Sequence, residues 1–331
     1  MSSLRRKERE VAAGDADADV LGAMAGALTG GEVSGADATT ASWRDVRTRF
    51  ARDRVGVGAL VLLGAIVRFC LAAPLFAALT GHAVNLQDYN ALSADGRPLG
   101  PFSSGYLLGT DSNGRDLLVR LAYGGRVSLA IATTATLATL FVGVTLGMLA
   151  GYARGWLDTI VSRVIEVTMA FPFLLFAIAL SIVGQHVFPS TFASAAIIVV
   201  IITTFSWFYP ARIVRAQVLS LREREFIQAA RMLGLPSRTI VAQHVLPHVL
   251  PNVLVLGSYL VGINIGVEAA LSFLGVGLPT GTPSWGTMIQ SASSVYLTSP
   301  WLMIAPGAML VATTLATNVL GSSLNDAIER R

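Results

Sequence analysis

The feature that most constrains this chain is a series of six long blocks of apolar residues. A bilayer core about 30 Å thick requires about 20 apolar residues at the rise of a helix. A chain that crosses lipid also has to satisfy its backbone hydrogen bonds internally, so each block is expected to be a helix. The blocks cover approximately residues 55–79, 127–152, 164–183, 192–211, 250–278 and 301–320. They predict an all-α polytopic membrane protein with six transmembrane helices.

A soluble protein is the alternative, because a buried core helix can mimic one apolar block. Core helices are usually shorter, and a soluble core does not need six such blocks separated by polar connectors. The composition agrees with a membrane protein, since 53% of the residues are hydrophobic and only 13% are charged. These values lie outside the range of an ordinary soluble domain.

The arginines predict which connectors face the cytoplasm, because cytoplasmic loops are enriched in Lys and Arg. Two segments are basic, one before the first block and one between the fourth and fifth. Their arginines are Arg44, Arg47, Arg49, Arg52 and Arg54 in the first segment and Arg212, Arg215, Arg222, Arg224, Arg231 and Arg238 in the second. We expect both segments to be cytoplasmic, and an even number of spans then gives an N-in/C-in topology. This charge pattern accounts for the basic balance without a nucleic-acid partner.

The expected organisation follows from these spans. Residues 1–53, rich at the start in Ala, Gly and Asp, are predicted to form a largely disordered cytoplasmic tail. Residues 54–322 form the transmembrane domain, with an external loop at 80–126 and a cytoplasmic loop at 213–249, and residues 323–331 form a cytoplasmic C-terminus. The first block lies too far along the chain for a cleavable signal peptide, so we expect an uncleaved anchor. Leu117, Leu118 and Leu121 predict a short helix along the outer membrane interface.

Motifs of catalytic chemistry are missing from the sequence: HExxH, GxSxG and GxGxxG do not occur. A P-loop needs a lysine after its glycines to reach the nucleotide phosphates, and the only lysine, Lys7, follows no glycine-rich loop. The single cysteine, Cys70, excludes an internal disulfide and a cysteine metal cluster. We therefore expect no catalytic, cofactor or metal site, and any ATP energy has to arrive through another subunit.

One short helix is predicted within the basic loop between the fourth and fifth blocks. Its leading acids mark a start near residue 223, and Gly234 and Pro236 mark a stop after residue 233. The expected docking face has small residues at its centre and consists of Phe226, Ala229, Ala230 and Leu233. The expected polar face carries Glu223, Arg224, Gln228 and Arg231.

The motif in this loop resembles the EAA loop of the permease subunits of ABC importers. The similarity lies in Gln228-Ala229-Ala230, Gly234 and Leu246-Pro247. The resemblance implies a coupling helix that inserts into a cleft on a separate ATPase. The coupling residues it implies are Glu225, Phe226, Gln228, Ala229, Ala230, Leu233 and Gly234. Two positions depart from the pattern, because Gln228 replaces a glutamate and His244 replaces an isoleucine.

Further motifs are similar to the C-type permease of the dipeptide, oligopeptide and nickel group. They include Gly109-Thr110-Asp111, Gly114-Arg115-Asp116, Ala170-Phe171-Pro172 and Pro283-Ser284-Trp285-Gly286. The resemblance implies a type I ABC importer permease in a bacterial cytoplasmic membrane, with di- or oligopeptide cargo or, alternatively, nickel chelates. The partners it implies are the lipid bilayer, a second homologous permease, two ABC ATPase subunits and an extracytoplasmic peptide-binding protein. The ATPase subunits, separate or fused into one, bind ATP and Mg.

Ionisable groups inside the apolar blocks are costly unless they face a partner or water. Glu268 is expected to face the bundle interior, where it either contacts cargo or holds a neighbouring helix, and Asn264 is placed with it on a possible translocation path. Glu166 is expected near an interface, paired with Arg163, and Arg68 has no partner in sequence. The same carboxylates leave a rival open, a proton-linked secondary carrier or channel that works without an ATPase.

Overall fold

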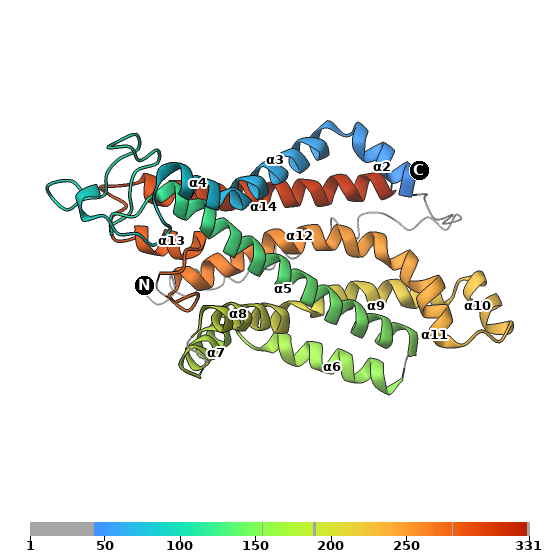
Figure 1. The fold of residues 1–331 in the computed structure, drawn as a ribbon. Helices are drawn as coiled ribbons and strands as arrows, with labels where there is room; N and C mark the ends of the chain where they lie inside the picture. The colour runs from blue at the N-terminus through green and yellow to red at the C-terminus, as the bar shows by residue number, and fades with distance from the viewer. Residues whose placement is uncertain (1–42, 154, 188–189, 280, 330–331) are drawn as a thin grey trace, which may run out of the picture. The chain divides into compact units, whose positions relative to one another are not determined.

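The computed structural model describes residues 43–153, 155–187, 190–279 and 281–329, and all regular elements within them are helices. Figure 1 shows the long helices running roughly side by side. The elements are α2 (Trp43–Arg52), α3 (Arg54–Leu71), α4 (Ala73–Thr80), η1 (Tyr89–Ala91), α5 (Leu117–Ala153), α6 (Trp156–Ala170), α7 (Phe173–Val187), α8 (Thr191–Ser206), α9 (Phe208–Arg222), α10 (Glu225–Met232), α11 (Ser237–Ile240), a π-helical turn η2 (Val241–Val245), α12 (Leu246–Phe273), α13 (Trp285–Ala292) and α14 (Trp301–Glu329).

Four helical segments are long and apolar enough to cross a bilayer within the described ranges: Arg54–Leu71, Leu117–Ala153, Ser237–Phe273 and Trp301–Glu329. Two bent pairs, α6 with α7 and α8 with α9, raise the number to as many as six if each pair is one span. The sequence-predicted blocks therefore all fall on helices, and the number of complete crossings lies between four and six.

The block at 164–183 is not one helix, which corrects the sequence expectation. α6 and α7 meet at an angle of 86°. Pro172 lies at the break, and the residue before it, Phe171, has an extended backbone with φ −87° and ψ 132°. A residue before proline is pushed out of the helical region, so the chain has to turn here. The milder bend of 41° between α8 and α9 precedes Pro210, which has no N–H to continue the ladder.

Helix α5 is the centre of the bundle and begins ten residues earlier than its apolar block. The Asp116 carboxylate caps it by accepting hydrogen bonds from the backbone N–H groups of Leu118 (2.9 Å) and Val119 (3.2 Å). The separate interfacial helix predicted around Leu117 and Leu121 is therefore wrong. Both leucines are buried in the first turns of α5, in a cluster with Trp285.

A row of glycines brings α5 and α9 into direct backbone contact. Gly143, Gly147 and Gly151 recur at four-residue spacing on one face of α5. A Cβ atom on each would lie only 2.6, 2.6 and 2.9 Å from a backbone carbonyl oxygen of α9 or of its N-cap residue. The carbonyls belong to Trp207, Ala211 and Arg215, which are also four residues apart. This is the small-residue packing by which membrane helices approach closely.

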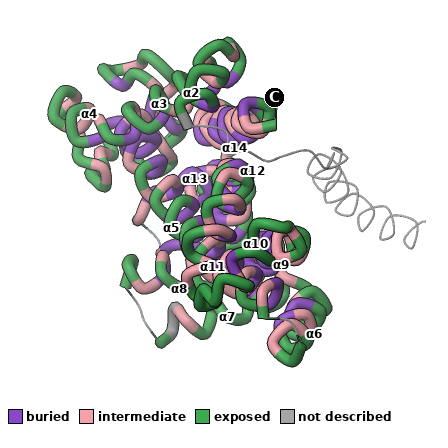
Figure 2. The backbone as a smooth tube through the Cα atoms, turned by 90° about the vertical axis from the view of Figure 1, so that its right-hand side faces the viewer, coloured by how far each residue is buried: buried purple, intermediate pink, exposed green. Residues whose placement is uncertain are grey.

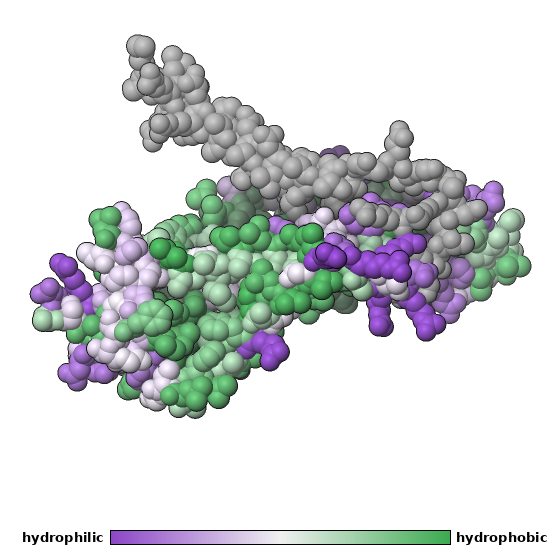
Figure 3. Space-filling model, turned by 90° about the horizontal axis from the view of Figure 1, so that it is seen from above, coloured by the Kyte–Doolittle hydropathy of each residue, from purple (hydrophilic) through white to green (hydrophobic). Residues whose placement is uncertain are grey.

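The unit has two polar ends. α2, the last turn of α14 and α10 lie together at one end, here called the α10 end, whereas η1, its long connector and α13 lie at the other, the α13 end (Figure 1). Buried positions concentrate where the helices face one another (Figure 2). Apolar residues cover much of the middle of the visible surface, with hydrophilic residues toward the ends (Figure 3). This distribution fits a bundle whose middle lies in lipid.

The N-terminal tail predicted for residues 1–53 falls largely outside the described residues. Residues 43–52, which the sequence analysis included in that tail, form α2. Val46 of α2 is buried, and α2 packs against α14 and α3. Arg68, for which the sequence showed no partner, lies exposed in the last turn of α3, which ends at Leu71. From there its side chain can extend toward the α13 end.

Candidate functional site

Helix α10 is a short element with a well-defined start and end. Glu225 lies in its first turn, where an acidic side chain complements the helix dipole. Gly234 adopts a left-handed backbone with φ +78°. The N–H of Leu235 donates to the Ala230 carbonyl (3.2 Å) and the N–H of Gly234 to the Arg231 carbonyl (3.0 Å). These two bonds form a Schellman cap, so the predicted stop at Gly234 has a specific physical basis.

One face of α10 is anchored in the bundle. Ile227 is completely buried, and Ala230 is 5% exposed. They pack in a cluster with Val214 and Val218 of α9, Val245 of η2, and Val249 and Val253 of α12. The helix is therefore packed against the ends of two long helices and is not part of an unsupported loop.

The opposite face of α10 is open and partly apolar. Met232 and Leu233 are 83% and 82% exposed, and Phe226 is 40% exposed. Ala229 and Gln228 are exposed as well. Ala230, which the sequence analysis expected on the docking face, is turned toward the bundle, and Met232 lies on the open face. The sequence pattern missed Ile227 as the anchor, although its position three residues before Ala230 is the helical spacing that could have indicated it.

Two aromatic contacts steady α10 from its sides. The Phe226 ring stacks on the ring of His248, with centroids 5.3 Å apart. The Arg231 guanidinium lies over the ring of Tyr152 at 5.0 Å from the centroid, which is cation–π geometry. Tyr152 is the penultimate residue of α5, so α10 contacts α5 as well as the α9 and α12 segments.

Glu268 and Asn264, placed by the sequence on a possible translocation path, are both fully buried between helices of this chain. The Glu268 carboxylate accepts hydrogen bonds from the hydroxyls of Ser128 and Ser272, each at 2.8 Å. Ser128 Oγ also accepts the backbone N–H of Trp285 at 3.1 Å. Asn264 Nδ2 donates to Thr136 Oγ1 at 2.9 Å. Of the two roles considered for Glu268, this geometry supports the one that holds helices together, joining α12, α5 and α13.

Replacing Glu268 by alanine is expected to destabilise the protein by about 3 kcal/mol or more, because it removes two buried hydrogen bonds and leaves a cavity. Glu268→Gln retains the shape and one acceptor, so a loss of about 1 kcal/mol is expected. The thermal unfolding midpoint of the purified complex measures both changes. Unchanged stability of the alanine variant together with altered cargo uptake would instead support the path role.

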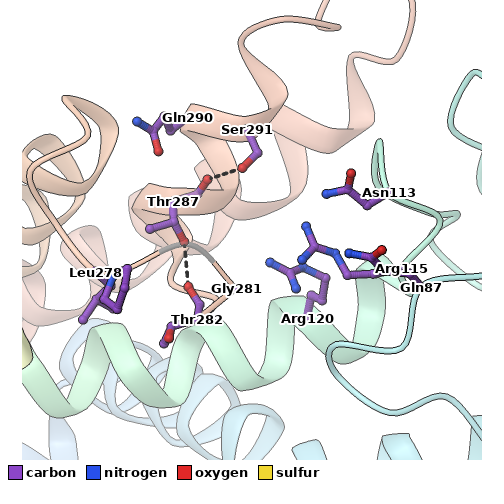
Figure 4. Close-up of a pocket in the computed structure, with 11 residues that line it drawn as sticks. Gln87, Asn113, Arg115, Arg120, Leu278, Gly281, Thr282, Thr287, Gln290 and Ser291 are labelled. Carbon is purple, nitrogen blue, oxygen red and sulfur yellow. Dashed lines mark hydrogen bonds between the residues drawn. The ribbon is translucent and has the colours of Figure 1, made fainter. Parts of the chain in front are cut away.

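A polar cavity of about 390 Å³ lies at the α13 end. Figure 4 shows the guanidinium groups of Arg115 and Arg120 on one side of it and Thr282, Thr287 and Ser291 on the other. Arg115 belongs to a tight turn in which Asp111 Oδ1 accepts the backbone N–H groups of Asn113 (2.8 Å) and Arg115 (3.0 Å). The sequence around Gly114 resembles a family motif, but the sequence alone does not indicate a binding role for Arg115.

The connector beside this cavity is held to α5 by His82. Its Nδ1 lies 2.8 Å from Asp116 Oδ2, and its ring stacks on Tyr106 with centroids 4.5 Å apart. Burial and the neighbouring carboxylates of Asp88 and Asp116 raise the pKa of Tyr106. Its hydroxyl therefore stays protonated at neutral pH and donates to Asp88 at 3.5 Å.

Comparison with known proteins accounts for this arrangement. Residues 143–331 match the family of the binding-protein-dependent transport system inner membrane component, and residues 42–95 match the N-terminal TM domain of oligopeptide transport permease C. The oligopeptide transport system permease proteins OppC of Haemophilus influenzae and Escherichia coli K12 are 37% and 38% identical to this chain. Each alignment covers 87% of this chain, and 88% and 90% of the respective relatives. The chain belongs to this inner membrane component family.

Another relative is named for dipeptides and not for oligopeptides. The dipeptide transport system permease protein DppC of Alkalihalophilus pseudofirmus is 32% identical over 87% of this chain and 89% of the relative. Among solved structures, inward-facing MetNI methionine ABC transporter aligns with a TM-score of 0.52 over 63% of this chain and 96% of that chain, at 18% identity. The likeness to MetNI concerns the fold, and it confirms the predicted ABC importer permease fold. The predicted family and the multi-pass membrane location are confirmed as well.

Proposed function

We propose that this chain is the membrane-spanning subunit of a binding-protein-dependent ABC importer that moves di- or oligopeptides into the bacterial cytoplasm. The observation that carries the proposal is the geometry of α10. Its inner face is fixed in the bundle by Ile227, while Met232 and Leu233 present an open apolar edge at the α10 end. A fixed helix with an exposed apolar edge is suited to transmit force from a partner that binds it.

The partners proposed for this chain follow from that arrangement and from the family. Two ATPase subunits, separate or fused, bind and hydrolyse ATP with Mg and engage α10, and this chain itself carries no enzymatic activity. A second homologous permease completes the path through the bilayer. An extracytoplasmic binding protein delivers peptides at the α13 end. The topology is N-in/C-in with six spans, each bent pair counting as one, which places α2, the end of α14 and α10 on the cytoplasmic side.

The secondary carrier receives no support from the carboxylates that suggested it. Glu268 is closed off between helices by two serine hydroxyls. Glu166 forms an exposed ion pair with Arg163, with the nitrogen and oxygen 2.7 Å apart. A proton-linked carboxylate needs access to water from each side of the membrane in turn. A carboxylate buried between helices does not have that access.

Reconstitution tests this function. The purified complex of both permeases and the ATPase subunits is placed in vesicles with the binding protein and a labelled tripeptide. We expect uptake that requires ATP and binding protein together, and competition by unlabelled peptide but not by a nickel chelate. Full-speed uptake by the permease chains in vesicles without the ATPase would overturn the proposal, and stronger competition by the nickel chelate would overturn the peptide cargo.

A further inference from the structure

The cavity at the α13 end has the dimensions and lining of a site for a small polar ligand. Its volume of about 390 Å³ falls within the range of small-molecule sites, about 300–1,000 Å³. Among the described residues that line it, the only charged side chains are Arg115 and Arg120, and the apolar ones are Leu278 and Pro279. The remaining side chains are hydroxyls and amides. The lining therefore carries positive charge and many neutral hydrogen-bonding groups.

The two arginines share one carboxylate. Asp111 Oδ2 lies 2.8 Å from Arg115 Nε and 3.3 Å from Arg120 Nε. Asp116, the next acid in sequence, is already engaged by His82 and by the first turn of α5. Asp116 is not among the residues that line the cavity, so at its wall the two guanidinium groups are matched only by the carboxylate of Asp111. A partly buried charge without a matching counter-charge favours binding of an anion.

Both guanidinium groups are held in place before any ligand arrives. The Arg115 and Arg120 side chains are 10% and 6% exposed. Arg120 Nη1 donates to the Val84 carbonyl and to Asn85 Oδ1, each at 3.3 Å. Within the described part of the chain, Nε is the only side-chain nitrogen of Arg115 that donates a hydrogen bond. The terminal nitrogens of Arg115 are thus available for a planar anion, and a fixed guanidinium loses little freedom when it binds a carboxylate.

We propose that this cavity binds the C-terminal carboxylate of the peptide cargo on the external side of the membrane. The proposal rests on the importer function above and adds a cargo-binding site to it. Arg115 and Arg120 bind the carboxylate, while Thr282 and Gln290 offer a hydroxyl and an amide group to the peptide backbone. A site that reads the carboxylate and backbone, with little apolar lining, accepts many side chains. The shared end of all peptides is then the feature recognised.

Binding of trialanine and of trialanine amide to the purified permease–ATPase complex tests this site. The titrations are followed by ligand-observed NMR without binding protein. The wild-type complex is expected to bind trialanine at least about tenfold more tightly than the amide, as loss of a charged hydrogen bond predicts. Arg115→Gln should weaken trialanine binding about tenfold and leave the amide unchanged, and Arg115→Lys should restore part of the difference. Arg97→Gln, an exposed arginine of the same connector, is the matched control and should behave as wild type.

Equal affinity of the wild-type complex for the acid and the amide would overturn the proposal. So would an Arg115→Gln variant that binds trialanine normally but docks the binding protein poorly, since the arginine would then serve an acidic group of that protein. If the complex imports peptide with ATP but Arg115→Gln does not change trialanine binding, only the cavity site is disproved. If the wild-type complex shows no ATP-dependent uptake, both the importer function and this inference are disproved.

Discussion

Replacing Leu233 by aspartate is expected to abolish ATP-driven transport while leaving the protein folded in the membrane. Leu233 is 82% exposed, so the charge disturbs no contact within this chain. In a partner's cleft, however, a buried unpaired carboxylate costs several kcal/mol, which weakens engagement by on the order of a hundredfold. ATP-dependent peptide uptake and recovery of the ATPase subunits on purification both report the loss.

Leu297→Asp is the matched control for that substitution. Leu297 is also 82% exposed but lies in the segment between α13 and α14, at the other end of the bundle. It should insert, fold and retain its ATPase subunits as the wild type does. Normal uptake by Leu233→Asp would show that the exposed edge of α10 is not where the ATPase acts.

Substituting Gly147 by alanine is expected to destabilise the bundle by about 1–3 kcal/mol through overpacking. The new Cβ atom would lie 2.6 Å from the Ala211 carbonyl oxygen, and backbone cannot move aside as a side chain can. Either α5 and α9 separate along their length or the variant fails to accumulate. The thermal unfolding midpoint and the amount of protein in membranes measure the effect.

Gly64→Ala provides the opposite case. No atom lies within 4 Å of a Cβ built on Gly64, which sits in the interior of α3. Alanine stabilises a helix interior relative to glycine by about 1 kcal/mol, so a neutral or slightly raised unfolding midpoint is expected. If both variants behaved alike, the close approach at Gly147 would not be a determinant of stability.

The sequence predicted the helices well because lipid imposes length and apolarity on each span independently of its neighbours. It predicted α10 for a similar reason, since Glu225 and Gly234 act locally on the start and end of a helix. The turn at Pro172 was also readable, because the restriction on the preceding residue is local, yet the uninterrupted apolar run obscured it.

The contacts between helices were harder to predict from the sequence. Whether Ala230 or Met232 faces outward depends on the cluster in which Ile227 packs, and that cluster is assembled from residues of α9, α11, η2 and α12. Glu268 illustrates the same limit, because Ser128, its partner, lies 140 positions away. The glycine row of α5 was readable as a repeat of four, but its partner helix was not. The pairing of Arg115 with Arg120 across Asp111 likewise required the fold of the connector.

Helix α5 joins the two places where this chain is proposed to meet its partners and its cargo. Its 37 residues contain no proline and correspond to a rod about 55 Å long. Arg120 lies near one tip and Tyr152, which supports Arg231 of α10, near the other. A rod of that length displaces its far tip by about 1 Å for each degree of tilt. In the proposed mechanism, a small tilt of α5, driven by the ATPase at the α10 end, changes the width of the arginine cavity at the α13 end and so releases the bound peptide.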